Sequence, residues 1–150
     1  MPSAPTLCRP DSLGALLGAV RSELVHAIEA QIAAKGLELR FTQFLILERL
    51  TRLGPMRATE LARAVDVDCG AMTRQLDQLE HRGYLRRCPH EQDRRALRIE
   101  LTADGTALWR QLAGCGEQVV AAAQAPLDPS ERKQLLDYLR RMLQVLRADH

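Results

Sequence analysis

The sequence lacks the features that mark several common classes of small protein. No apolar run approaches the roughly 20 residues that a membrane-spanning helix needs. The segment Met1–Asp11 has neither the basic region nor the continuous apolar region of a secretory signal. The four cysteines, at positions 8, 69, 88 and 115, form no Cys-x-x-Cys pair, which argues against a zinc ribbon or a dense disulfide scaffold. We therefore expect a cytoplasmic protein with free thiols and no membrane partner.

Aromatic residues and catalytic motifs are also scarce. Two Phe, two Tyr and one Trp offer little of the stacking surface that recognition of single strands and RNA loops requires. The glycines are scattered rather than gathered in a phosphate-binding loop, and no histidine accompanies a serine in a familiar catalytic motif. The histidines at 26, 81, 90 and 150 show no metal-ligand spacing with one another or with the cysteines. We expect no enzymatic activity, no cofactor and no metal site.

The positive charge lies in the middle third of the chain. Residues 1–48 carry four Lys/Arg against five Asp/Glu, residues 49–98 carry eleven against seven, and residues 99–150 carry six against seven. The middle segment therefore has a net charge of +4 between two segments of −1 each. A basic segment in an otherwise balanced protein is typical of a polyanion partner. A solvated surface would also account for an excess of this size.

Hydrophobic periodicity predicts a mainly α-helical protein with a small β-hairpin. The hydrophobic content of 46% is sufficient for a folded core. Apolar spacings of three and four residues, with Gly and Pro stop signals, predict the helices, and two short alternating runs predict the strands. The expected helices cover about 11–35, 42–53, 58–64 (capped by Thr59), 69–82, 103–125 and 130–148, with a turn over 65–68 and strands over 84–88 and 97–101.

The first and last helices carry apolar stripes that a chain of this length cannot easily bury against its own small middle domain. We expect these helices, about 11–35 and 103–148, to pair with a second copy of the chain in a homodimer. An intramolecular helical bundle is the alternative. The expected interface residues are Leu13 and Leu17 in the first helix and Leu135, Leu139, Met142 and Leu146 in the last.

The segment of about 42–101 reads as helix, turn, helix and β-hairpin, which is the plan of a winged helix-turn-helix lobe. Arg74 has the reach to bond a guanine, Gln75 an adenine, and Thr73 a phosphate or a thymine methyl group. Duplex DNA is therefore the expected partner, although Arg74 could instead pair with Asp77 or Gln78. The predicted contact residues on the second helix, the recognition helix, are Asp68, Cys69, Gly70, Ala71, Thr73, Arg74 and Gln75.

The hairpin loop 91–95 presents Asp93, Arg94 and Arg95 beside the recognition helix. Arginines on such a wing suit a narrow minor groove, where negative potential is concentrated. The carboxylate of Asp93 can hold an arginine in one rotamer through a bidentate pair, so less side-chain entropy is lost on binding. An ordinary solvated loop is the alternative.

The middle segment resembles the MarR (multiple antibiotic resistance regulator) family. Leu61-Ala62, the run Met72–Glu80, Gly83-Tyr84-Leu85 and Arg87 are similar to the family's helix-turn-helix, and Asp93-x-Arg95 with Leu101-Thr102-x-x-Gly105 is similar to its wing signature. The resemblance covers about residues 12–147. It implies a homodimer on a palindromic operator, with Arg74 in the major groove and Arg95 in the minor groove, oriented by Asp93. It also implies a repressor released by a small phenolic ligand bound between the dimerisation helices and the DNA-binding lobe.

Other members of that family sense oxidants through cysteine, and two cysteines are weighed for that role here. Cys8 precedes the first helix near where the peroxide-sensing branch keeps its reactive thiol, but the supporting tyrosines are absent because Tyr84 and Tyr138 lie elsewhere. Cys69 stands at a helix N-terminus, which lowers a thiol pKa. Cys88-Pro89 is a very short match to a haem-binding dipeptide. A redox-sensing regulator and a winged-helix module for protein contacts are the alternative functions.

Overall fold

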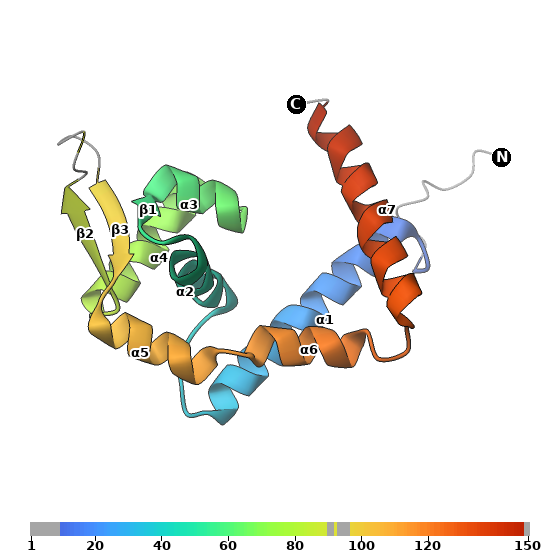
Figure 1. Cartoon of the computed structure of the whole chain (residues 1–150), viewed down its shortest axis with the longest axis horizontal. Helices are drawn as coiled ribbons and strands as arrows, with labels where there is room; N and C mark the ends of the chain where they lie inside the picture. The colour runs from blue at the N-terminus through green and yellow to red at the C-terminus, as the bar shows by residue number, and fades with distance from the viewer. Residues whose placement is uncertain (1–9, 90–91, 93–96, 149–150) are drawn as a thin grey trace. The chain divides into compact units, whose positions relative to one another are not determined.

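The computed structural model describes residues 10–89, 92 and 97–148 (Figure 1). Their contacts divide the chain into one unit that ends at Cys115 and a second that begins at Gly116. The chain is mainly helical with a small antiparallel sheet, as predicted. The elements in order are α1 (Leu13–Ala34), α2 (Phe41–Leu53), β1 (Met56–Arg57), α3 (Ala58–Val65), α4 (Cys69–His81), β2 (Leu85–Pro89), β3 (Leu97–Leu101), α5 (Ala103–Leu112), α6 (Cys115–Ala123) and α7 (Pro129–Ala148).

Short polar side chains begin several of the helices. Ser12 accepts a hydrogen bond from Ala15 N at 3.3 Å at the start of α1, and Thr102 accepts one from Gly105 N at 3.1 Å at the start of α5. Such caps satisfy amide groups that the first turn of a helix leaves without partners. The predicted cap Thr59 is wrong: α3 begins at Ala58, and its N-cap is Arg57, two residues before Thr59. The backbone N of Arg57 donates to Glu60 at 3.0 Å.

The core of the first unit forms where α2, α3, α4 and α5 pack against the sheet (Figure 1). The apolar faces of α3 (Leu61, Ala62, Val65) and α4 (Met72, Leu76, Leu79) are buried in this core. The rings of Phe44 on α2 and Trp109 on α5 lie 5.4 Å apart between centroids, which joins these two helices. The most buried side chains include Ile46, Leu47, Leu61, Met72, Leu76, Leu79, Ile99 and Leu112.

The sheet contains one strand more than predicted. Its order is β1-β3-β2, and β1 pairs with β3 through Met56 opposite Ile99. Two residues after Gly54-Pro55 are too few to show an alternation, so sequence periodicity gave no signal for β1. In the hairpin Arg87 lies opposite Ile99. Because residues opposite one another share a face of the sheet, Arg87 lies on the face that carries the buried Ile99.

The predicted helix over 103–125 is two helices. The helix is interrupted after Leu112, where Ala113 is extended and Gly114 has φ 89°. The left-handed region costs little only for glycine, so Gly114 permits this break. The apolar stripe continues through Leu108, Leu112 and Val119 across the break, and for that reason the periodicity did not reveal it.

The second unit contains the rest of α6 and all of α7. Asp128 and Glu131 cap α7 reciprocally, with Asp128 N donating to Glu131 at 2.8 Å and Glu131 N donating to Asp128 at 2.9 Å. Pro129 is the first residue of α7, where a missing N–H and a fixed φ do no harm. No residue of α7 is buried in the single chain.

Candidate nucleic-acid interface

The turn between α3 and α4 holds the start of α4 at the surface. Asp66 has φ 56° and ψ 53°, a left-handed conformation that Asp tolerates better than most residues. Val67 N then donates to Ala62 O at 3.0 Å, which closes the end of α3. Asp68 caps α4 by accepting from Ala71 N at 2.8 Å. The two helices are thus joined by the tight turn that a helix-turn-helix requires.

Most of the predicted contact residues of α4 lie on its exposed side. Asp68 is already used as the helix cap, and a Cβ at Gly70 would lie 3.3 Å from the Asp68 Oδ1. Small residues at this end would allow a partner's backbone to come close to the helix. The exposed members are Asp68, Cys69, Gly70, Thr73 and Arg74, whereas Ala71 and Gln75 are half-buried.

Arg74 is not engaged by the neighbours that could have occupied it. Asp77 accepts from Arg87 at 2.8 Å, and the Oε1 of Gln78 accepts from Gln43 at 3.0 Å. Among the described residues none makes a hydrogen bond, ion pair or ring contact with Arg74. The alternative in which Arg74 pairs with Asp77 or Gln78 is therefore not what the structure contains, and the guanidinium is available to an outside acceptor.

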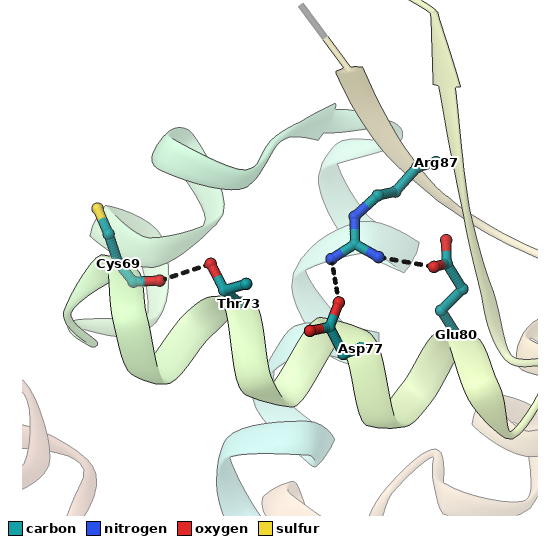
Figure 2. A network of polar contacts seen from close by, with 5 residues as sticks. All are labelled: Cys69, Thr73, Asp77, Glu80 and Arg87. Carbon is teal, nitrogen blue, oxygen red and sulfur yellow. Dashed lines mark hydrogen bonds and ion pairs between the residues drawn. The ribbon is translucent and has the colours of Figure 1, made fainter.

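Thr73 and Gln75 are less available than Arg74. The hydroxyl of Thr73 donates to Cys69 O at 2.9 Å, which leaves its methyl group as the part that remains unbonded (Figure 2). The Oε1 of Gln75 is buried and has no hydrogen-bond partner within the described part of the chain. The helical spacing predicted Gln75 on the outer face of α4, but in the structure it is half-buried.

Arg87 of β2 is a residue of this interface to which the sequence pattern assigned no role. Its guanidinium donates to Asp77 at 2.8 Å and to Glu80 at 2.7 Å (Figure 2). The available signal was the spacing of the two carboxylates, which stand three residues apart and so share one face of α4.

The opposite face of the hairpin carries a second polar cluster. The thiol of Cys88 donates to Glu100 at 3.0 Å, and Arg86 is paired with the same carboxylate. The hydrogen bond to Glu100, with partial burial, raises the pKa of Cys88 above its ordinary value. The bonds from Cys88 and Arg86 lower the pKa of Glu100. A raised thiol pKa disfavours the reactive thiolate, so this environment does not favour Cys88 as an oxidant sensor. Cys8 lies outside the described residues.

A groove opens beside the C-terminal end of α4. Its volume is about 650 Å³, within the usual range for small-molecule sites. Arg40 and Arg82 supply positive charge, and Gln78 lies in the wall as part of α4. The remaining lining residues are Glu29, Ala33, Leu37, Glu38, Leu39 and Gln43.

Three of the predicted contact residues, Asp93, Arg94 and Arg95, lie outside the described residues. Across the described ranges, no three His, Cys, Asp or Glu side chains are grouped so that they could hold a metal ion. Within the same ranges, no helix has the length and apolar character needed to cross a membrane.

Comparison with known families identifies relatives of the chain. A sequence model of the MarR family matches residues 39–97. The HTH-type transcriptional repressor NicR of Pseudomonas putida is 31% identical over 106 residues, which cover 71% of this chain and 67% of the relative. Matches to the multiple antibiotic resistance protein MarR of Salmonella typhimurium reach 37% identity over 75 residues but cover only 52% of that protein, about half its length.

Solved structures are similar over most of the chain. MarR of Escherichia coli, in a cysteine mutant complexed with operator DNA, has a TM-score of 0.82 at 25% identity and covers 93% of this chain and 99% of that one. BpsR of Bordetella bronchiseptica, solved in connection with regulation of its DNA binding by 6-hydroxynicotinic acid, has a TM-score of 0.79 at 26% identity, covering 89% and 94%.

Proposed function

The chain belongs to the MarR family, and on that premise we propose that it is a transcriptional regulator that binds duplex DNA as a homodimer. The observation that carries the proposal is the exposed N-terminal half of α4, where Arg74 has no partner among the described residues while Asp77 and Gln78 are bonded elsewhere. The similarity to a chain solved with operator DNA supports it further. The family is one of transcriptional regulators, which supports a regulatory role rather than an enzymatic one.

In this proposal α4 lies in the major groove, with Arg74 reading a guanine and the residues from Asp68 to Thr73 close to the DNA backbone. Arg95 enters the minor groove and Asp93 orients it, with Arg94 beside them, as the family resemblance implies. Two lobes of a homodimer would meet the two halves of a palindromic operator. A protein that regulates genes in this way works in the cytoplasm of a bacterium, where the DNA is.

We also propose that the activity is repression relieved by a small aromatic ligand. The groove at Arg40 and Arg82 supports this, because Arg82 could bind an acidic group while the apolar residues contact a ring; Arg40 is already paired with Glu29 at 3.7 Å. Gln43 in the same wall donates to Gln78 of α4 at 3.0 Å. A ligand seated there would touch the recognition helix itself, so it could change the position of α4 relative to DNA.

Selection of genomic fragments tests DNA binding. Purified protein should retain a small set of duplex fragments that share a palindromic element, and single strands should not compete for it. The affinity should fall by orders of magnitude between roughly 50 and 200 mM salt, because phosphate contacts release counterions. Retention without sequence enrichment, or affinity that is independent of salt, would contradict the proposed function.

Calorimetry with 6-hydroxynicotinic acid as the probe tests the ligand groove. The parent protein should bind the probe and release its operator fragment. Arg82→Ala should weaken probe binding, whereas Arg110→Ala, on the exposed side of α5, should leave it unchanged. Equal probe binding by both variants would place the ligand site elsewhere.

A further inference from the structure

Arg87 connects the wing to the recognition helix through two ion pairs. Its Nη2 lies 2.8 Å from Asp77 Oδ1 and its Nη1 lies 2.7 Å from Glu80 Oε1 (Figure 2). Two acceptors three residues apart on one helix fix both the height and the rotation of α4 against β2. A single ion pair would leave the helix free to rotate about that contact.

The surroundings of Arg87 distinguish it from a surface arginine that could turn toward DNA. The Arg87 side chain is 23% exposed, compared with 63% for its neighbour Arg86. It leaves the sheet on the face of the buried Ile99, so its stem packs inward and its guanidinium emerges at α4. Partial burial strengthens an ion pair relative to one in bulk water.

The ion pairs of Arg87 with Asp77 and Glu80 matter for DNA binding because both carboxylates are negatively charged. Asp77 and Glu80 are 62% and 41% exposed on the helix that is proposed to enter the major groove. Unpaired, both would repel phosphates, and Asp77, three residues from Arg74, could also pair with it. Arg87 occupies both carboxylates, so Asp77 is not available to Arg74.

We propose that Arg87 is a positioning residue for operator recognition: it holds α4 at a fixed orientation to the wing through Asp77 and Glu80 and keeps Asp77 away from Arg74, without touching DNA itself. The inference rests on the proposed function. It assigns to Arg87 a contribution to sequence discrimination rather than to general attraction for phosphates. Lysine is not an equivalent replacement, because its donors share one nitrogen, whereas two separate nitrogens of the Arg87 guanidinium reach the two carboxylates.

The test compares Arg87→Lys with the matched control Arg86→Lys on the same strand, in the full-length protein. Both substitutions keep the charge, and Arg86 is paired with Glu100 on the other face of the sheet. Operator and random duplex affinities are measured over a salt series. Arg87→Lys should lower operator affinity by about tenfold, a change of the size that coupled charged networks give. It should leave random-duplex affinity and the salt slope unchanged, and Arg86→Lys should leave the ratio of the two affinities as in the parent.

A second test uses the isosteric variants Asp77→Asn and Glu80→Gln, which remove the negative charge of each carboxylate. Operator and random-duplex affinities are measured for both. Simple electrostatics predicts tighter binding to every duplex, whereas the positioning role predicts loss of operator discrimination. A double-mutant cycle of Asp77→Asn with Arg87→Lys should be non-additive for operator affinity. Circular dichroism and denaturant titration confirm that each variant folds.

The outcomes separate the inference from the function on which it rests. If the parent selects an operator and Arg87→Lys discriminates equally well, the positioning role is overturned while the function stands. If Arg87→Lys weakens operator and random duplex together and lowers the salt slope, Arg87 is a phosphate contact and the inference is likewise overturned. If the parent itself selects no duplex, the proposed function fails, and the inference fails with it.

Discussion

Arg74 on α4 and Arg87 on β2 differ in their ion pairs because different acidic side chains are available to them. Arg87 finds two carboxylates at 2.7 and 2.8 Å, whereas Arg74 finds neither Asp77 nor Gln78 available. The sequence pattern predicted a contact role for Arg74 on α4 and assigned none to Arg87 on β2. It could not say which arginine would take Asp77, since that depends on a strand whose position relative to the helix is fixed only by tertiary packing.

Replacing Arg74 tests whether it reads a base. Arg74→Ala should cost about 1–3 kcal/mol of binding free energy on the true operator and should relax the preference at one base pair in each half-site. The measurement is operator affinity together with a set of single base-pair substitutions, at fixed salt. Arg110→Ala on the exposed side of α5 is the control. Equal weakening on operator and random DNA would make Arg74 a phosphate contact instead.

Glu100 should control the reactivity of Cys88. The carboxylate accepts a hydrogen bond from the thiol and raises the pKa of Cys88, so the thiolate fraction near pH 7 is below that of an ordinary cysteine. Glu100→Gln removes the negative charge and leaves Arg86 nearby, which lowers that pKa and increases the thiolate fraction. We therefore expect several-fold faster alkylation of Cys88 by iodoacetamide at neutral pH, because the thiolate is the nucleophile.

Mass spectrometry of the alkylated peptides follows each cysteine separately. Across a pH series, the rise in the Cys88 rate should move to lower pH in Glu100→Gln than in the parent. The buried Cys115 is the internal reference and should not respond. An unchanged or slower rate at Cys88 would show that Glu100 does not set its pKa.

Sequence periodicity and glycine positions predict those features of the helices and strands that depend on neighbouring residues alone. The buried faces of α3 and α4 follow the 3.6-residue period of a helix, and Gly83, with a φ of 82°, follows the end of α4, where glycine is favoured. The break at Gly114 and the strand β1 were missed. The strand β1 depends on its pairing with the distant residues Ile99 and Arg98. The break at Gly114 interrupts a continuous apolar stripe, and the stripe itself gives no sign of it.

The Leu-Thr-x-x-Gly motif at the start of α5 has a steric reason that the sequence alone did not supply. Thr102 caps the helix, and its hydroxyl also donates to Gly83 O at 2.6 Å. This draws the first turn of α5 against the chain at Tyr84. A Cβ at Gly105 would lie 2.1 Å from Tyr84 O, a backbone atom that cannot move away without disturbing the hairpin.

Gly105→Ala should therefore destabilise the protein although alanine is the better helix former. We expect a loss of about 1–3 kcal/mol or more in the free energy of unfolding, the range for overpacking in a closely packed site. Gly18→Ala is the control, because nothing lies within 4 Å of a Cβ added there, and it should add about 0.5–1 kcal/mol through helix propensity. Denaturant titration at one protein concentration measures both, and equal effects of the two substitutions would contradict the steric reason.

At the scale of the whole molecule, the distribution of exposed apolar residues bears on whether two copies of the chain associate. The unit that ends at Cys115 has a core of its own, whereas α7 has no buried residue. On α1, Leu13 is 55% exposed and Leu17 is 41% exposed, and on α7 Leu135 and Leu146 are 40% and 59% exposed. A helix of 20 residues gains most of its stability from packing its apolar face. The apolar faces of α1 and α7 are the surfaces that the proposed homodimer would bury.

The predicted interface residues of α7 are Leu135, Leu139, Met142 and Leu146, which we call the α7 seam. Charged side chains introduced into this seam should separate the two copies of the homodimer. We expect the parent to have twice the 16.8 kDa mass of one chain by light scattering. Replacing both Leu139 and Met142 with Asp should give the monomer mass or an unfolded chain, because burying an unpaired charge in an interface is strongly unfavourable. Lys133→Asp with Arg140→Asp makes the matched control, since it adds the same side chains to α7 at exposed polar positions and should leave the dimer mass unchanged. A folded dimer in the Leu139 and Met142 double variant would move the interface away from this seam, and a dilution series establishes whether either variant only weakens association.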